Sequence, residues 1–194
     1  MKKIILASQS PRRSELLKQI GLDFEVIVSE AEENINSNIP KEVVIKLSAI
    51  KAEAVKEKMV DNVDYNDAII IGADTVVAID DIIMGKPKDR ADAQNMLRRL
   101  SDNTHSVWTG VTILWNDGKK MCKKSFAKET KVRMYPIEEK EIEDYLDSGE
   151  ADDKAGAYAI QGLGGKFIEY IQGDYNNVVG LPVAEVYQQI KKII

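Results

Sequence analysis

The chain has 194 residues, of which 44% are hydrophobic and 30% charged, and its formal net charge at pH 7 is −5. This content is enough for one sizeable core, so we expect a single domain over residues 1–194. The acidic balance argues against general nucleic-acid binding, which needs a basic face. No apolar stretch approaches the roughly 20 residues of a membrane span, and a single cysteine, Cys122, excludes an internal disulfide, so we expect a cytoplasmic protein.

Strand-like and helix-like patterns alternate along the chain. Short apolar and β-branched runs predict strands over residues 4–7, 24–28, 68–71, 75–79, 82–84, 105–114, 126–134 and 167–171. Apolar residues at helical spacing predict helices from Pro11 to Gly21, from Pro40 to about Val60, from Asp89 to Leu100, from Ile137 to Leu146, and from Pro182 onwards. Turn residues predict hairpins at Asp80-Asp81 and Asn116-Asp117-Gly118. The mixture predicts an α/β or α+β domain.

The segment Ser8-Gln9-Ser10-Pro11-Arg12-Arg13 runs from a predicted strand end into a predicted helix start. A helix start carries partial positive charge and free N–H donors, so two arginines in its first turn are unfavourable unless an anion binds there. Hydroxyls, N–H groups and two guanidinium groups together suit a polyphosphate. The alternative is that Arg12 and Arg13 pair with surface carboxylates such as Glu15.

Asp74 lies between two apolar strand segments, in the sequence Gly72-Ala73-Asp74-Thr75-Val76-Val77. A carboxylate in such a place needs a hydrogen bond, a paired charge or a metal ion. We expect Asp74 to accept a proton from water or to bind a divalent cation, and the hydroxyl of Thr75 to orient a neighbour. The alternative is a turn aspartate that follows Gly72 and bonds its own backbone.

Two lysines are candidates for neutralising phosphate charge. Lys51 falls on the apolar stripe of its predicted helix, where a buried ammonium needs a partner such as a ligand phosphate or Asp74. Lys86, in Gly85-Lys86-Pro87, closely follows a predicted return strand and is expected near Asp74. For both lysines the alternative is an ammonium that reaches water.

Two glycine-rich loops, 153–165 and 173–182, are candidates for the walls of a pocket, because glycine allows tight turns and close backbone approach. Gln161 carries one acceptor and two donors, which suits the edge of a pyrimidine. A flexible surface loop and a cap of the last helix are the alternatives. His105 is the sole histidine and has no obvious triad around it, so we expect a structural role for it.

Together these segments resemble the Maf family of nucleotide pyrophosphatases, a family once named for septum formation. The resemblance covers nearly the whole chain, and five segments in this order carry it: Leu6 to Leu17, Gly72 to Val77, Gly85 to Pro87, Asp153 to Tyr158 with Ile160 to Gly162, and Val178 to Pro182. It implies hydrolysis of a nucleoside triphosphate to the monophosphate and pyrophosphate. It also implies a fold like inosine triphosphate pyrophosphatase, with a long mixed sheet flanked by helices and two lobes around a cleft.

The resemblance further implies roles for individual residues. Asp74 matches the proton acceptor, and a divalent metal, Mg²⁺ or Mn²⁺, is expected at Asp74 together with Glu33. The sequence departs from the family at Ser29-Glu30-Ala31-Glu32-Glu33, which lacks the usual aspartate before the glutamate, so Glu32 is the alternative to Glu33. The positions linked to substrate selectivity are Arg12, Thr75 and Gln161. The polar or phosphate-contacting positions are Ser8, Arg13, Lys51 and Lys86.

Within the family, Ile160-Gln161-Gly162 is similar to the branch that acts on dTTP and UTP, whereas the branch that acts on 7-methyl-GTP tends to carry Glu in place of Gln161. We therefore expect hydrolysis of dTTP and UTP, with modified pyrimidine nucleotides as further candidates. The alternatives are a 7-methyl-GTP pyrophosphatase and a non-catalytic nucleotide-binding regulator of septum formation. The expected partner is a nucleotide rather than nucleic acid or a membrane, and a homodimer is a further expectation.

Overall fold

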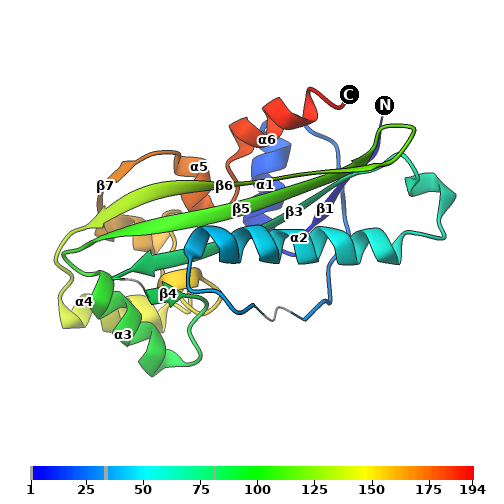
Figure 1. Ribbon diagram of the computed structural model, residues 1–194. Coiled ribbons are helices and arrows are strands. Elements are labelled where there is room, and N and C mark those ends of the chain that lie inside the picture. The colour runs from blue at the N-terminus through cyan, green and yellow to red at the C-terminus, as the bar shows by residue number, and fades with distance from the viewer. Residues whose placement is uncertain (1, 33–34, 81) are drawn as a thin grey trace.

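The computed structural model describes residues 2–32, 35–80 and 82–194. Within these ranges, seven strands form one sheet in the order β2-β1-β3-β5-β6-β7, and β4 pairs with β3 beside this path (Figure 1). β1 is parallel to β2 and β3, and the other pairs are antiparallel. The strands are β1 (Ile4–Ala7), β2 (Glu25–Val26), β3 (Ile69–Ile79), β4 (Ile82–Met84), β5 (Thr104–Asn116), β6 (Met121–Met134) and β7 (Ile168–Gln172).

Helices cover both faces of the sheet (Figure 1). α2 (Pro40–Lys58) packs along one face, and α1 (Pro11–Gln19), α5 (Tyr175–Val179) and α6 (Val183–Ile190) pack on the other. α3 (Arg90–Leu100) and α4 (Glu139–Asp147) enclose a further apolar cluster with the end of β3 and with β4. Three short 3-10 helices are η1 (Val63–Tyr65), η2 (Ala155–Ala157) and η3 (Leu163–Phe167). The prediction of a mixed α/β fold, with a sheet flanked by helices, is confirmed.

Successive residues of β3 point to opposite faces of the sheet, as in any strand. Ala73 belongs to the apolar cluster with α1 and α6, whereas Ile70 and Val76 belong to the clusters formed with α2. Asp74 therefore lies on the α2 face of the sheet, and Thr75 lies on the α1 face.

α2 lies very close to β3 at Gly72. A Cβ at this position would be 2.2 Å from the backbone oxygen of Ser48 and 2.9 Å from the Cβ of Ala52. The missing side chain thus allows the helix to rest directly on the strand. This close approach brings Lys51 of α2 beside Asp74 of β3.

One edge of β3 is interrupted between two partner strands. β1 pairs with Ile69 to Gly72, and β4 pairs with Val77 to Ile79. In the part of the chain that the structure describes, no strand pairs on this side with the stretch from Ala73 to Val76. β1 ends at this gap, and ligands of α/β sheets bind outside the carboxyl ends of such strands. The topology therefore leaves room for a site where β1 stops.

The structure corrects three local predictions. β3 runs without a break from Ile69 to Ile79, so the alternative in which Asp74 is a turn residue is wrong. β2 covers only Glu25–Val26. The loop predicted over 173–182 contains α5, whose first turn is capped by the Asp174 side chain.

The predicted turn at Asp80-Asp81 includes Asp81, which lies outside the described residues, while β3 and β4 do pair antiparallel. The longer hairpin of β5 and β6 is confirmed. None of the helices in the described chain combines the length and the apolar character needed to cross a membrane.

Candidate active site

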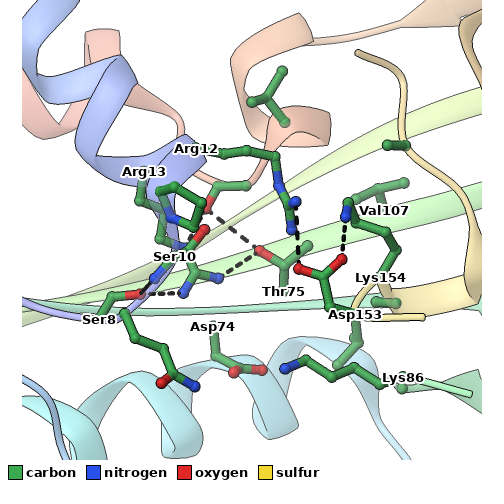
Figure 2. A pocket seen from close by; sticks show the side chains of 18 of the residues that line it. Ser8, Ser10, Arg12, Arg13, Asp74, Thr75, Lys86, Val107, Asp153 and Lys154 are labelled. Atoms are coloured by element: carbon green, nitrogen blue, oxygen red, sulfur yellow. Dashed lines mark hydrogen bonds and ion pairs between the residues drawn. The ribbon is translucent and has the colours of Figure 1, made fainter. Parts of the chain in front are cut away.

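A cavity of about 650 Å³ opens at the interrupted edge of β3. Its walls are the segment that follows β1, the middle of β3, one turn of α2, and the loops around 153–161 and 178–180. Figure 2 shows Arg12, Arg13 and Asp74 around the same space. Eight predicted site residues line this cavity: Ser8, Arg12, Arg13, Lys51, Asp74, Thr75, Lys86 and Gln161. Glu32, the alternative to Glu33 as a metal ligand, is not among the lining residues. Glu33 lies outside the described residues.

The start of α1 favours an anion. Ser10 occupies the N-cap position, as predicted, but its side chain caps no helical N–H, and the first turn carries no acidic residue. The Ser8 hydroxyl instead accepts a hydrogen bond from the backbone N–H of Ser10 at 3.2 Å. A positive helix end without an acidic side chain attracts negative charge from a ligand.

Arg13 joins three segments that are distant in the sequence. Its Nε donates to the carbonyl oxygen of Gly180 at 2.8 Å, and its terminal nitrogens donate to Ser8 Oγ and Ala73 O at 3.0 Å and to Thr75 Oγ1 at 3.1 Å. The residue is only 9% exposed. Arg13 thus fixes the wall of the cavity, a role that the sequence did not predict.

Asp74 and Lys51 form an ion pair at the floor of the cavity. The Lys51 Nζ donates to Asp74 Oδ1 at 2.5 Å, and the two side chains are 17% and 12% exposed. Of the two partners considered for a buried Lys51, a ligand phosphate or Asp74, the structure shows the contact with Asp74. Figure 2 shows that the side chains of Asp74 and Lys86 extend toward each other across this floor.

The Asp153 carboxylate on the cavity wall lies near several cationic side chains. Its Oδ2 lies 3.7 Å from an Arg12 terminal nitrogen, and Lys154 also donates to its carboxylate (Figure 2). Burial opposes ionisation of Asp153, but the hydrogen bond from Lys154 and the charges of Lys154, Arg12 and Lys86 outweigh it and hold its pKa below the ordinary value. An ionised carboxylate therefore lies between three cations in this structure.

The α1 side of β3 carries a hydroxyl network. Thr75 Oγ1 lies 2.9 Å from Thr109 Oγ1, and Thr109 donates to the carbonyl oxygen of Asn177 at 3.0 Å. The buried Asn177 side chain donates to the backbone oxygen of Val107 and to Thr130. This network attaches α5 to β5 and so holds the loop that carries Gly180 against the cavity.

Tyr158 connects the cavity wall to the buried end of β5. Its hydroxyl lies 2.7 Å from His105 Nε2, and the rings meet edge to face. Burial lowers the pKa of His105 to about 4. His105 is therefore neutral at pH 7 and does not line the cavity, in keeping with the expected structural role.

Sequence comparisons show the family of the chain. A family model described as Maf-like protein matches residues 3–193. The chain belongs to the Maf-like protein family. A protein named dTTP/UTP pyrophosphatase from Agathobacter rectalis is 49% identical, with 100% of this chain and 98% of that protein covered. A protein of the same name from Thermoanaerobacter sp. is 48% identical over 98% of this chain and 96% of its own length.

Among solved structures, the chain is similar to the crystal structure of a nucleoside-triphosphatase / dITP/XTP pyrophosphatase from Mycobacterium abscessus. The TM-score is 0.44, the sequence identity is 12%, and the alignment covers 99% of this chain and 98% of that chain.

The divalent metal expected in this Maf-like chain would have few protein ligands. Within residues 2–32, 35–80 and 82–194, no three His, Cys, Asp or Glu side chains form a ligand group. Asp74 contributes one carboxylate to the cavity. Mg²⁺ in nucleotide-processing sites is commonly held by one or two carboxylates plus substrate phosphates, so this donor set fits the ion.

Two residues of the Maf-like site were not singled out from the sequence. Asp153 and Lys154 stand at the start of the glycine-rich loop that also carries Gln161, and both line the cavity. Their adjacent opposite charges resemble an ordinary solvated pair. The signal that identifies them is the distant Arg12, which only the folded chain brings to Asp153.

Proposed function

We propose that this protein hydrolyses dTTP and UTP to the monophosphate and pyrophosphate in the cytoplasm. The observation that carries the proposal is that the arginines of α1 and the carboxylate of Asp74 line one cavity. The basic side chains favour the binding of phosphates. A carboxylate beside them repels a phosphate and so weakens binding, which indicates that it takes part in the reaction. The names of the relatives at 48–49% identity support the same activity.

The charges around the cavity suit a triphosphate. Five basic side chains line it among the described residues: Arg12, Arg13, Lys51, Lys86 and Lys154. Asp153 engages Arg12 and Lys154 in this structure, and a bound phosphate would compete for the same donors. We place the phosphates over the start of α1, where the helix end adds its own positive charge.

Asp74 is positioned to act on water. In the proposed step, a water oxygen attacks the α-phosphorus while its proton passes to the Asp74 carboxylate. The bond between the α-phosphorus and the bridging oxygen breaks, and its electron pair leaves with pyrophosphate. Lys51 donates to Asp74 Oδ1, which fixes the carboxylate group in place. Most of the rate enhancement then comes from positioning and charge neutralisation.

We further propose that Asp74 and phosphate oxygens of the substrate together hold a divalent cation, Mg²⁺ or Mn²⁺, with Glu33 as a second carboxylate. When bound, the ion supplies additional neutralisation of phosphate charge. Gln161 borders the cavity on the exposed side, where we place the base. Its neutral amide donates and accepts, as thymine and uracil require.

The test is a substrate panel of dTTP, UTP, CTP and 7-methyl-GTP with Mg²⁺, followed by separation of the products. We expect the monophosphate and pyrophosphate in equal amounts from dTTP and UTP. Intact dTTP and UTP, or stepwise release of orthophosphate, would overturn the proposal. Turnover of 7-methyl-GTP in preference to both pyrimidines would overturn the assignment of the base.

A further inference from the structure

The turn that carries Gln161 is held by hydrogen bonds on both sides. Before it, the backbone N–H of Ala159 donates to the Tyr145 hydroxyl at 3.3 Å. After it, the N–H groups of Leu163 and Gly164 donate to the two carboxylate oxygens of Glu150, at 2.9 and 3.1 Å. The short segment between these anchors is Ile160-Gln161-Gly162.

The two anchoring side chains also bind each other. The Tyr145 hydroxyl donates to Glu150 Oε1 at 3.1 Å, and the Tyr145 ring is fully buried, edge to face with Phe167. Burial opposes ionisation of Glu150, but the hydrogen bonds from Leu163, Gly164 and Tyr145 outweigh it and keep its pKa below the ordinary value. Glu150 is thus a carboxylate at pH 7 and can accept all three bonds.

The fit around this pair leaves little space. Gly162 has a φ of +97°, and a Cβ on it would lie 2.4 Å from Glu150 Oε2. The turn therefore takes a backbone conformation that favours glycine and lies directly on the carboxylate. Neither Tyr145 nor Glu150 lines the cavity, whereas Gln161 does.

We propose that Glu150 and Tyr145 are positioning residues that set base selectivity through Gln161, without touching the substrate. The inference rests on the proposed function, in which the Gln161 amide reads the pyrimidine. An amide selects a base only if its donor and acceptor groups are held opposite the matching groups of the base. Here Tyr145 of α4 and Glu150, which follows that helix, hold the segment that carries the amide. The phosphate-binding wall on α1 is a separate part of the site and does not depend on this pair.

The experiment compares kcat/KM for UTP and GTP in the wild type, Glu150→Gln and Tyr145→Phe. Glu150→Gln keeps the size of the side chain but replaces one of the two acceptor oxygens by an NH2 donor, which cannot accept from the backbone N–H that faces it. Tyr145→Phe removes only the hydroxyl. In either variant we expect the UTP-to-GTP ratio to fall at least about tenfold, the effect of one lost well-placed hydrogen bond. We expect this fall to appear mainly in KM for UTP. Exposed Glu143 on α4 provides the matched control, and Glu143→Gln should leave the ratio unchanged.

Two further measurements separate positioning from general loosening. The Kd for inorganic triphosphate, a probe without a base, should stay within about twofold in Glu150→Gln, because the wall on α1 is unaffected. In a Gln161→Ala background, Glu150→Gln should cause no further loss of the ratio, because residues that act through one another are non-additive. Should Glu150→Gln not fold, Tyr145→Phe carries the same comparisons.

An unchanged ratio in the folded variants, or an equal loss of triphosphate binding, would overturn the inference. A wild type that hydrolyses neither UTP nor dTTP would instead remove the proposed function. A wild type that prefers UTP together with a Glu150→Gln variant that keeps this preference would refute only the role of the pair.

Discussion

The Lys51 ammonium of α2 lies 2.5 Å from the Asp74 carboxylate of β3, and both side chains are largely buried. The two residues come from different elements, and the close approach of α2 at Gly72 is what joins them. The pair places a fixed carboxylate beside a basic cavity, which is the arrangement that water activation near phosphates requires.

Removing the ammonium should leave the Asp74 charge without its partner. We expect Lys51→Met to lower the free energy of unfolding by about 1–3 kcal/mol, the usual cost of a buried polar group that loses its hydrogen bond. Exposed Lys46 on the same helix is the matched control. Urea unfolding of Lys51→Met, Asp74→Asn and the double variant forms a cycle. Strict additivity of the two single effects would contradict a direct interaction.

The two arginines at the start of α1 should respond differently to a conservative change. Arg13 donates to four oxygens at 9% exposure, whereas the Arg12 side chain is 25% exposed and points to Asp153. We expect Arg13→Lys to cost about 2 kcal/mol or more of folding stability, because a lysine cannot reproduce this set of bonds. Arg12→Lys should change stability by less than about 0.5 kcal/mol.

Steady-state kinetics should also distinguish Arg12 from Arg13. We expect Arg12→Lys to raise KM for UTP about tenfold, the effect of losing roughly 1.4 kcal/mol of binding. Thermal unfolding and steady-state kinetics on both variants provide the check. Equal loss of stability in the two would contradict the structural role of Arg13.

The contact between α2 and β3 at Gly72 gives a stability prediction. A methyl group there would meet the Ser48 backbone oxygen at 2.2 Å, so Gly72→Ala forces the helix away from the strand. We expect a loss of about 1–3 kcal/mol, typical of overpacking. Gly85 is the matched control, because a Cβ on it has no neighbour within 4 Å. Similar unfolding midpoints for Gly72→Ala and Gly85→Ala would show that the contact is unimportant.

His105 gives a pH dependence. Burial lowers its pKa from 6.5 to about 4, so the unfolded chain binds a proton at a higher pH than the folded chain. Its neutral form therefore contributes fully above pH 6.5, and stability falls as the pH drops toward 4, by about 3 kcal/mol in total at 1.36 kcal/mol per pKa unit. Thermal melts of the wild type and His105→Gln between pH 4 and 7 test this. The wild type should lose more stability on acidification, and parallel curves would contradict the assignment.

The alternation of elements could be predicted from the sequence because it depends on local patterns, whereas the set of site residues was expected from the family resemblance. Apolar spacing in α2 placed Lys51 on the inner face, and Lys51 does meet Asp74. The continuity of β3 could not be predicted, since Gly72 and Asp74 have the composition of a turn. Only pairing with β5 on one side and with β1 and β4 on the other keeps this stretch extended.

The different roles of Arg12 and Arg13 could not be predicted from the sequence either. Arg12 and Arg13 are identical residues in one helical turn, and nothing local distinguishes them. The acceptors that engage Arg13 lie as far as 167 residues away, at Gly180. Glu150 was missed for the same reason, because its partners Leu163 and Gly164 meet it only when the loop folds back.

The proposed hydrolysis depends most directly on Asp74, and the decisive measurement is the rate of UTP hydrolysis by Asp74→Asn beside that of the wild type. The substitution keeps the shape of the side chain but removes the proton acceptor. We predict that kcat falls by at least about 10²-fold, the usual scale for a lost general base, while inorganic triphosphate still binds. A variant that releases pyrophosphate at a near-normal rate would contradict the account.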